Sequence, residues 1–403
     1  PASGAVNNLP FDVQPVIAIQ DAFGNTVANS SAVVTISSNN GSTIVGSSSA
    51  TAVNGVATFS GTGMKGLPVT PYTLTYASSS LVQTSQGITI TNAPAPLITG
   101  SVPPTGNDPS NPGNSVSLYD AQTGQPNGVA VPFPNFMGQI RVAAGDFNND
   151  GRSEIVAGAG PGGGPAVTIL DSQTGAPRAS FFAYDQSFKG GIYVAVKDIN
   201  NDGIADIITG AGFGGGPHVK VFNGVNLQEM RSFFAYTETF TGGVSVATAD
   251  INGDNILDIV TGAGPGGGPH VKVFDGATNS ILSQWYAYPV SFKGGVFVAM
   301  GDISNDGSFE VVTGAGIGGG PVVAVWNPLT GALQSQFFAY SQSFTGGVRV
   351  GVSDATGDGI LDLVTGAGPG GGPQVNAYNY PNLDLLFSFF SGPETNTQGV
   401  FVS

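Results

Sequence analysis

Five short acidic segments are the parts of this 403-residue chain most able to do chemistry. Each is nine residues long, with carboxylates at positions 1, 5 and 9 and an amide or hydroxyl oxygen at position 3. Three carboxylates this close repel one another, and five repetitions of that repulsion favour a compensating cation. An oxygen-rich ligand set suits Ca²⁺, whereas Mg²⁺ keeps more waters and zinc prefers His or Cys.

The candidate calcium ligands are the side chains at positions 1, 3, 5 and 9 and the backbone carbonyl at position 7. In chain order they are Asp146, Asn148, Asp150, Arg152 and Glu154; Asp198, Asn200, Asp202, Ile204 and Asp206; Asp250, Asn252, Asp254, Ile256 and Asp258; Asp302, Ser304, Asp306, Ser308 and Glu310; and Asp354, Thr356, Asp358, Ile360 and Asp362. Position 6 is Gly in four segments and Asn255 in the third, and both types tolerate a left-handed turn. One such segment alone could be an ordinary turn without an ion. An EF-hand is disfavoured, because its glutamate stands at position 12 and helices flank it.

The acidic segments also explain the charge of the chain. They hold 15 of the 26 Asp and Glu residues, and the remaining 11 balance the 11 Lys and Arg, so the net charge of −15 belongs to these segments. Without a basic stripe, a nucleic-acid partner is disfavoured. The chain has no Cys, which excludes disulfides and thiolate metal sites, and no stretch of 18 apolar residues that could insert into a membrane.

The acidic segments are positioned by an internal repeat of 52 residues. The repeated residues are Asp146, Asp198, Asp250, Asp302 and Asp354, with Pro165, Pro217, Pro269, Pro321 and Pro373, and Phe136, Phe188, Phe240, Phe292 and Phe344. Within residues 295–346, four apolar runs separated by turns read GGVFVAMGD, FEVVTGAG, PVVAVWN and ALQSQFFAY. Four antiparallel strands in each repeat predict the blade of an all-β propeller.

The two ends of the repeat region are expected to complete one further blade. Residues 97 to about 138 resemble strands two to four of a unit, and GVFV at 399–402 matches the first strand at 295–298. Joining them closes a ring and removes the exposed sheet edges of an open array. The sequence therefore predicts a six-bladed β-propeller whose sixth blade combines both ends.

Residues 97–403 resemble the FG-GAP repeats of integrin α-subunit propellers and of many bacterial surface proteins. The resemblance rests on a D-x-N-x-D-G-x-x-D segment, an apolar strand and a Gly-rich turn ending in Pro. It implies an extracellular protein whose cation loops stiffen one face of the propeller while partners dock on the other. Ser304 and Thr356 replace the usual Asn or Asp, so weaker or water-mediated contacts are expected there. Integrin propellers have seven blades, which differs from the six expected here.

Residues 1–93 share none of the repeat and are predicted to form a separate domain ahead of the propeller at 94–403. Alternating runs such as AVVTISS and YTLTYAS indicate a β-sandwich. The phrases LPFDVQPVIAIQDAFGNTV and NGVATFSG resemble the bacterial immunoglobulin-like repeats of invasin and intimin-type adhesins. Such repeats open with one more strand, so an upstream segment or a neighbouring subunit is expected to supply it, which would build fibres or arrays.

Other motifs support structure rather than catalysis. The GAGPGGGP turns precede β-branched strands, not the helix that a phosphate loop needs. His218 and His270 occupy one repeat position and are expected on partly exposed strands. The FFAY runs are expected to pack between blades, with a sugar-stacking platform as the alternative. No Ser, His and Asp set can be assembled, so the chain is not expected to be an enzyme.

These observations predict a non-catalytic, extracellular, calcium-stabilised surface, adhesion or matrix scaffold with about five Ca²⁺ sites. Its expected partners are other surface proteins, glycans or identical subunits. The alternative is a glycan-binding, lectin-like propeller.

Overall fold

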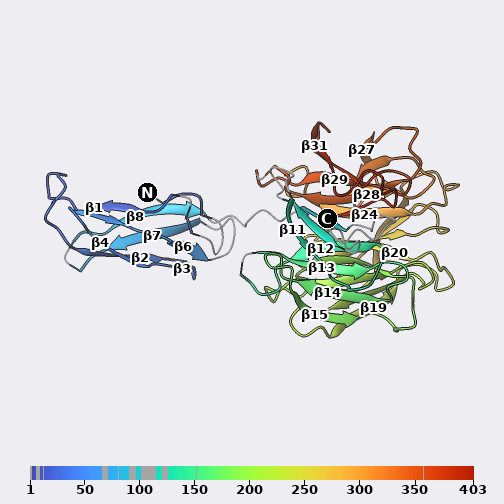
Figure 1. The fold of residues 1–403 in the computed structure, drawn as a ribbon, viewed down its shortest axis with the longest axis horizontal. Coiled ribbons are helices and arrows are strands. Elements are labelled where there is room, and N and C mark those ends of the chain that lie inside the picture. Colours follow the sequence, from blue (N-terminus) through green and yellow to red (C-terminus); the bar gives the residue numbers. More distant parts are fainter. Residues whose placement is uncertain are drawn as a thin grey trace. The chain divides into compact units, whose positions relative to one another are not determined.

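The computed structural model describes residues 2–5, 10–11, 13–65, 71–79, 81–89, 97–100, 115–119, 126–150, 152–356 and 358–403. All the secondary-structure elements assigned in these ranges are β-strands (Figure 1). None of the described residues forms a helix with the length and apolar character needed to cross a membrane. The chain divides into two compact units, Pro1–Ala93 with Asn149–Arg152, and Pro94–Asn148 with Ser153–Ser403.

The strands of the first unit pack around one apolar core. Its strands are β1 (Val16–Ala18), β2 (Val33–Ser38), β3 (Thr43–Val45), β4 (Ser49–Thr51), β5 (Val56–Thr58), β6 (Gly63–Lys65), β7 (Pro71–Ala77) and β8 (Thr84–Thr89). They form a four-stranded sheet in the order β4-β2-β7-β8 and two pairs, β1-β5 and β3-β6. Burial alternates along β7, with Tyr72, Leu74 and Tyr76 in the core, because successive side chains of a strand point to opposite faces.

The described residues of the second unit form six four-stranded antiparallel sheets. Their strands are β9 (Leu97–Gly100), β10 (Val116–Tyr119) and β11 (Pro126–Ala130) with β32 (Phe401–Val402); β12 (Ile140–Gly145), β13 (Glu154–Ala159), β14 (Ala166–Leu170) and β15 (Pro177–Phe182); β16 (Ile192–Lys197), β17 (Asp206–Ala211), β18 (His218–Phe222) and β19 (Glu229–Phe234); β20 (Val244–Ala249), β21 (Asp258–Ala263), β22 (His270–Phe274) and β23 (Ile281–Tyr286); β24 (Val296–Gly301), β25 (Glu310–Ala315), β26 (Val322–Trp326) and β27 (Leu333–Phe338); and β28 (Val348–Ser353), β29 (Asp362–Ala367), β30 (Gln374–Tyr378) and β31 (Leu385–Phe390). Repeated sheets of this kind are those of a β-propeller.

The repeat in the sequence becomes a repeat in strand register. In each of the five sheets formed by consecutive strands, the second strand is buried at all six positions, as in β17 and β25. The outermost strand alternates between exposed and half-buried positions, as in β19 and β27. Fully buried strands read as continuous apolar runs because neighbouring sheets cover both faces. The four-strand unit predicted for residues 295–346 is confirmed.

The two ends of the propeller sequence meet in one sheet. Strand β32 pairs with β9, with Phe401 opposite Gly100 and Val402 opposite Thr99. The innermost strands contact one another in the order β12, β16, β20, β24, β28 and β32, and β32 in turn contacts β12. The last strand of the chain therefore stands between the first and the last of the five consecutive sheets.

Tyrosines at the ends of the FFAY runs join neighbouring sheets. The hydroxyl oxygen of Tyr288 lies 3.1 Å from the carbonyl oxygens of both Thr313 and Val322 in the next sheet. Burial raises the pKa of the Tyr288 phenol far above its ordinary value. The same contacts recur at Tyr184 and Tyr236, and Tyr340 binds the Gln374 carbonyl oxygen and the Thr365 hydroxyl. Aromatic rings of adjacent sheets also pack together, as Phe181 does on Phe222 with 4.9 Å between ring centroids. The expected inter-sheet packing of the FFAY runs is confirmed.

Removal of one of these hydroxyls should weaken the propeller. We expect Tyr288→Phe to lower the free energy of unfolding by about 1–3 kcal/mol, because the buried carbonyl of Val322 loses its donor. Urea unfolding of both proteins measures the difference. The matched control is Tyr286→Phe, whose side chain is 51% exposed and whose hydroxyl should matter little. Equal midpoints for the two variants would contradict an inter-sheet role for the hydroxyl.

Candidate cation-binding loops

The five acidic segments form the loops between the first and second strands of five sheets. Residues 198–206, for example, connect β16 to β17, and residues 302–310 connect β24 to β25. The carboxylate at position 9 is in each case the first residue of the buried second strand. These five residues, Glu154, Asp206, Asp258, Glu310 and Asp362, are between 0% and 4% exposed. Positions 1 to 8 precede the strand, so the loop places its other acids nearer to solvent.

The acids at positions 1 and 5 turn back onto the backbone of their own loop. In the second loop, the Asp198 carboxylate accepts hydrogen bonds from the amides of Asp202, at 3.2 Å, and Gly203, at 2.8 Å. The Asp202 carboxylate accepts one from Ile204 at 2.9 Å, and the Asn200 side-chain oxygen accepts one from Asp202 at 2.9 Å. Asp250, Asp302 and Asp354 make the same contacts with the amides at positions 5 and 6 of their loops. The loop backbone thus converges on its first residue.

The buried acid at position 9 joins two turns of one sheet. One oxygen of Asp206 accepts a hydrogen bond from the amide of Ile199 in the acidic loop, at 3.0 Å. The other accepts from Gly224, at 2.8 Å, in the turn between the third and fourth strands. Asp258 bridges Ile251 and Gly276 in the same manner. A side chain cannot be added at Gly224 without a clash, because a Cβ there would lie 1.8 Å from the Ala205 carbonyl oxygen.

The electrostatics of the loops are unfavourable for their buried acids. Burial, together with the negative charges of Asp358 and Asp354, raises the pKa of Asp362 from 3.8 to about 6. Burial is also the largest cause of the raised pKa values of Asp206, Asp258 and Glu310, and an acid of the same loop contributes each time. A positive charge near these carboxylates would remove both effects.

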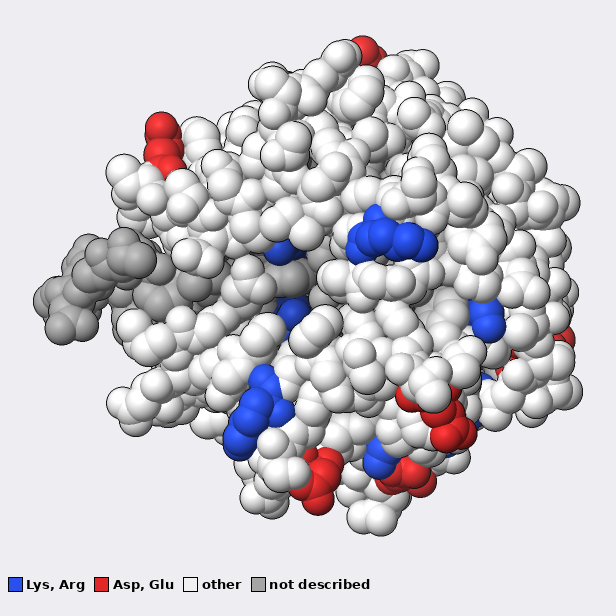
Figure 2. Space-filling model, turned by 90° about the vertical axis from the view of Figure 1, so that its right-hand side faces the viewer, with Lys and Arg blue, Asp and Glu red and all other residues white. Residues whose placement is uncertain are grey.

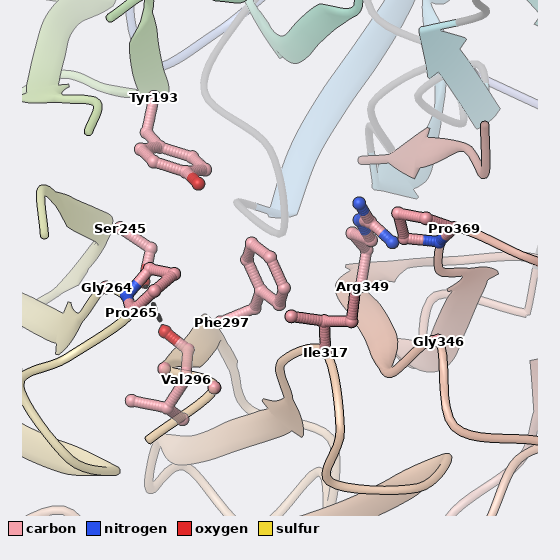
Figure 3. Close-up of a pocket in the computed structure, with 12 residues that line it drawn as sticks. Tyr193, Ser245, Gly264, Pro265, Val296, Phe297, Ile317, Gly346, Arg349 and Pro369 are labelled. Atoms are coloured by element: carbon pink, nitrogen blue, oxygen red, sulfur yellow. Dashed lines mark hydrogen bonds between the residues drawn. The ribbon is translucent and has the colours of Figure 1, made fainter.

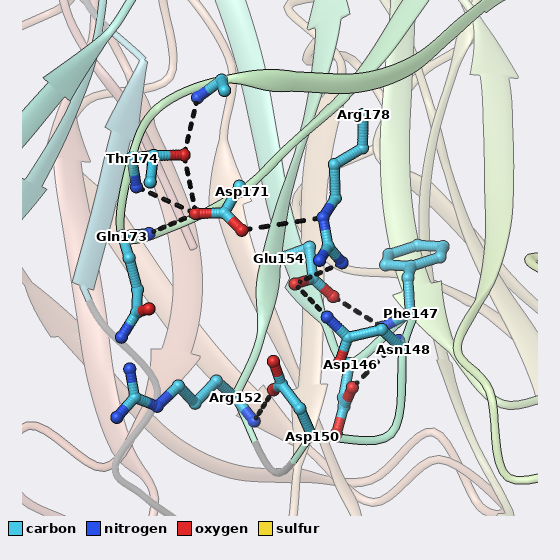
Figure 4. Close-up of polar contacts among 11 residues, drawn as sticks. Asp146, Phe147, Asn148, Asp150, Arg152, Glu154, Asp171, Gln173, Thr174 and Arg178 are labelled. Carbon is cyan, nitrogen blue, oxygen red and sulfur yellow. Dashed lines mark hydrogen bonds and ion pairs between the residues drawn. The ribbon is translucent and has the colours of Figure 1, made fainter.

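The first loop differs because a basic residue already approaches its buried acid (Figure 4). The Arg178 Nη1 atom lies 2.9 Å from Glu154 Oε1, and its Nε atom lies 3.6 Å from Asp171 Oδ2. The side-chain Nδ2 of Asn148 donates a hydrogen bond to the same Glu154 Oε1 atom, at 3.0 Å. The residues one repeat further along are uncharged, namely Met230, Leu282, Gln334 and Leu386. Sequence reasoning missed Arg178, although its charge is unique at that repeat position.

Left-handed backbone shapes these loops at two positions rather than one. The prediction for position 6 is confirmed at Gly203, Asn255, Gly307 and Gly359, which have φ between 65° and 87°. Position 4 is also left-handed in Asn149, Asn201, Gly253 and Asn305, with φ between 54° and 77°. Sequence reasoning missed position 4, where the signal was the repeated choice of Asn or Gly. Gly151 and Gly357 lie outside the described residues.

The loops therefore supply a calcium donor set without a preassembled cluster. Within the described parts of the chain, no three Asp, Glu or His side chains converge as a metal centre requires. The carboxylates at positions 1 and 5 receive backbone N–H groups, and Ser304 at position 3 donates to Glu310 at 3.1 Å. Hard oxygen donors in one nine-residue loop still match the ligands that Ca²⁺ takes. An ion would draw these carboxylates toward itself.

The remaining motifs have structural partners. His218 Nε2 lies 2.7 Å from Ser232 Oγ, and its ring stacks on Phe234 with 4.5 Å between centroids. His270 contacts Gln284 and Tyr286 in the same way, so both histidines lie on half-buried strand positions as expected. The Gly-rich turns are followed by strands, and their amides bind backbone carbonyls, as Gly266 does to Lys293 at 2.9 Å. That use of the amides disfavours a phosphate role.

Comparison with known proteins identifies the repeat. Residues 198–261 match the FG-GAP-like repeat family. The chain is 31% identical to chicken (Gallus gallus) integrin alpha-8 over 186 residues, which cover 39% of this chain and 17% of the relative. It is 28% identical to chicken integrin alpha-V over 232 residues, 50% of this chain and 22% of the relative. The matched region is thus less than a quarter of either relative.

A solved nidogen/laminin complex also shows some likeness, at 11% identity and a TM-score of 0.49. The match covers 76% of this chain and 97% of that chain. At those values the likeness says nothing about ligands. The FG-GAP-like match at residues 198–261, the partial likeness to integrin α-subunits and the repeated four-stranded sheets support an integrin-like β-propeller in the second unit.

Proposed function

We propose that this chain is a non-catalytic, extracellular adhesion scaffold whose propeller is stabilised by calcium bound in its acidic loops. The observation that carries the proposal is the buried acid at position 9, whose pKa is raised by burial and by acids of its own loop. Calcium would turn that repulsion into shared coordination. The integrin α relatives support an adhesion role for the propeller.

Calcium in a loop would stabilise the sheet around it. The position-9 acid already links the acidic loop to the turn between the third and fourth strands, as Asp206 links Ile199 to Gly224. With dissociation constants of about 10⁻⁴ to 10⁻³ M, ~1 mM calcium contributes roughly 0.4–1.4 kcal/mol per site. We rank the first loop weakest, because Arg178 already lies against Glu154. The fourth and fifth loops follow, with Ser304 and Thr356 at position 3.

The same proposal covers the ring and the first unit. The six sheets would act as the six blades of one closed propeller, and residues 1–93 as an immunoglobulin-like spacer. Without a catalytic set of side chains, the propeller would serve as a rigid platform for other surface proteins, glycans or identical subunits. An extracellular location suits calcium sites of this affinity, since calcium is plentiful there.

Removal of calcium should lower the melting temperature. We expect EDTA to reduce Tm by roughly 5 °C or more relative to 1 mM calcium, given about 2–7 kcal/mol from all five sites. Differential scanning calorimetry measures the change, and magnesium at equal concentration should restore only part of it. An unchanged Tm would remove the calcium component of the proposal.

A loop variant separates specific binding from general salt effects. Asp202→Asn removes one carboxylate from the second loop, and calorimetric titration should then find about one calcium fewer per chain. Asp185→Asn is the matched control, because Asp185 is an exposed acid outside the loops that binds the Ser187 amide. Equal calcium stoichiometry in the two variants would contradict loop binding.

The pH dependence of stability should reverse with calcium. Because the folded-state pKa of Asp362 is raised from 3.8 to about 6, the calcium-free folded protein binds protons more tightly than the unfolded chain. Its stability should therefore fall as pH rises between about 4 and 6. In calcium, stability should rise over the same window, because protonated carboxyls cannot hold the ion. Tm at several pH values tests this, and Asp362→Asn should flatten both slopes. Parallel slopes with and without calcium would contradict the prediction.

A groove in the first unit supports assembly by strand addition from a second copy. It has a volume of about 690 Å³ and is lined by β1 and the start of β8, with the exposed side chains Val16 (51%) and Val82 (99%) beside it. Among described residues, β1 pairs only with β5 and β8 only with β7. The Gln86 side chain of β8 already binds both backbone groups of Ala2 of the same chain, at 2.8 Å. Unpaired strand edges of this kind accept an added strand.

Assembly is tested by sedimentation velocity across a concentration series. We expect the chain to form higher oligomers as concentration rises, and we expect Val16→Lys with Val82→Lys to remain monomeric, because charge at an edge blocks strand addition. A control pair of Lys substitutions at the exposed residues Val225 and Val290 of the propeller should leave assembly unchanged. A monomer at high concentration would contradict the subunit version of the proposal.

A further inference from the structure

Six equivalent residues of the innermost strands gather at the centre of the propeller. Each is the second residue of its strand or, for β32, the first, and the series runs Arg141, Tyr193, Ser245, Phe297, Arg349 and Phe401 at 52-residue intervals. The three aromatic rings contact one another across the ring of sheets, with centroids 6.0 to 6.3 Å apart. Residues from different sheets can meet in this way only along the central axis.

The two arginines lie between these aromatic rings. The Arg141 Cζ atom is 4.4 Å from the Tyr193 ring centroid and 5.2 Å from that of Phe401. The Arg349 Cζ atom is 4.8 Å from the Phe401 centroid and 5.3 Å from that of Phe297. Phe401 therefore contacts both cations. Stacking of this kind fixes the plane of each guanidinium and leaves its N–H edge available.

Neither arginine has an anionic partner among the described residues. The ion pairs found there involve Arg178 and Lys220 only, while Arg141 and Arg349 are each 6% exposed. The Nε atom of each is buried without a hydrogen-bond partner, and one long contact of 3.4 Å joins Arg141 Nη1 to the Ile192 carbonyl oxygen. Burial lowers the pKa of Arg349 to about 10, and Arg141 is among the charges that lower it. Arg349 is still cationic at neutral pH.

An unpaired buried cation is costly, and here two occur side by side. The structure opens a path to one of them, Arg349. A pocket of about 170 Å³ is lined by Arg349, Tyr193 and Phe297, with Gly-rich turns such as Gly264 and Gly294 at its walls (Figure 3). The walls are close-packed backbone, because a Cβ on Gly264 would lie 2.0 Å from the Gly242 carbonyl oxygen.

The pocket opens away from the acidic loops. Its lining turns connect the second strand to the third, or one sheet to the next, at the strand ends opposite to those that carry the loops. Figure 2 shows a face with few acidic side chains and a central hollow that contains basic atoms. An anion could enter there without passing the acids of the cation loops.

We propose that this pocket binds a carboxylate, which the guanidinium edge of Arg349 recognises, while Arg141 contributes a second positive charge from across the Phe401 contact. A planar carboxylate matches the two parallel N–H groups of a guanidinium. The faces of Tyr193 and Phe297 favour a ligand that carries the carboxylate on a compact ring, such as a sugar acid. This site requires neither calcium nor the proposed scaffold function. It would let the propeller recognise a carboxylate on a small molecule or at the end of a longer one.

Calorimetric titration with glucuronate, acetate and glucose tests the proposal. Glucuronate and acetate should bind and glucose should not, with glucuronate tighter because its ring contacts the aromatic walls. Arg349→Gln should weaken glucuronate binding at least about tenfold, and Arg141→Gln should weaken it less, because Arg141 does not line the pocket. The matched control is Lys272→Gln, which removes another cation that lies over an aromatic ring, 5.0 Å from the Tyr236 centroid and outside the pocket. Equal binding of glucose and glucuronate, no binding of either acid, or normal binding by Arg349→Gln would overturn the proposal.

A stability measurement separates a binding role from a structural one. Because an unpaired buried charge is unfavourable, Arg349→Met should melt at the same temperature as the parent chain or higher when no carboxylate is present. Saturating glucuronate should then raise Tm of the parent chain but not of the variant. A large loss of stability in ligand-free Arg349→Met would show that the arginines are structural, which overturns the proposal. Both measurements are made in calcium and in EDTA, so that loss of the cation loops is distinguished from loss of the pocket.

Discussion

The pairing of β32 with β9 is the interaction on which the rest of the propeller depends. It consists of two residue pairs, Phe401 with Gly100 and Val402 with Thr99, extended by hydrogen bonds of 3.1 Å between Ser403 and Ile98 in both directions. Without it, β12 and β28 would each face solvent on one side, and the buried apolar strands next to them would be exposed. A short terminal strand thus holds five long sheets in a continuous circle of contacts.

Within that circle, each sheet repeats two links that work at opposite ends of its strands. The buried acid at position 9 joins two turns at the end that carries the acidic loops, as Asp206 does between Ile199 and Gly224. The tyrosine at the end of the fourth strand joins its sheet to the next, as Tyr288 does to Val322. The first link is internal to a sheet and charged, and the second is between sheets and neutral. Conditions that protonate these carboxyls therefore act on the links within single sheets rather than on the tyrosine contacts between sheets.

Sequence analysis predicted the features that follow from periodicity. A strict 52-residue interval fixes the strand order, the turn positions and the left-handed residue at position 6, because equivalent residues must adopt equivalent conformations. Features that depend on departures from the repeat were missed. Arg178 forms an ion pair with the buried acid of one loop, and uncharged residues replace it in the other repeats. Arg141 and Arg349 stand four repeats apart, and only the closed arrangement of the sheets brings them to the same aromatic ring. The spacing of the acids predicts that their carboxylates converge on a common cation. In the structure, backbone amides of the same loop bind those carboxylate oxygens instead, as the amides of Asp202 and Gly203 bind Asp198.

Phe401 makes two kinds of contact: its backbone pairs with Gly100 in the β32–β9 ladder, and its ring contacts both guanidinium groups. Any anion held by those groups is therefore bound only while the closing strand is in place. By thermodynamic linkage, occupancy at the axis and attachment of the terminal strand must favour each other by the same free energy. Separation of β32 from β9 would therefore weaken the binding of such an anion, and a bound anion would stabilise the pairing of the two strands.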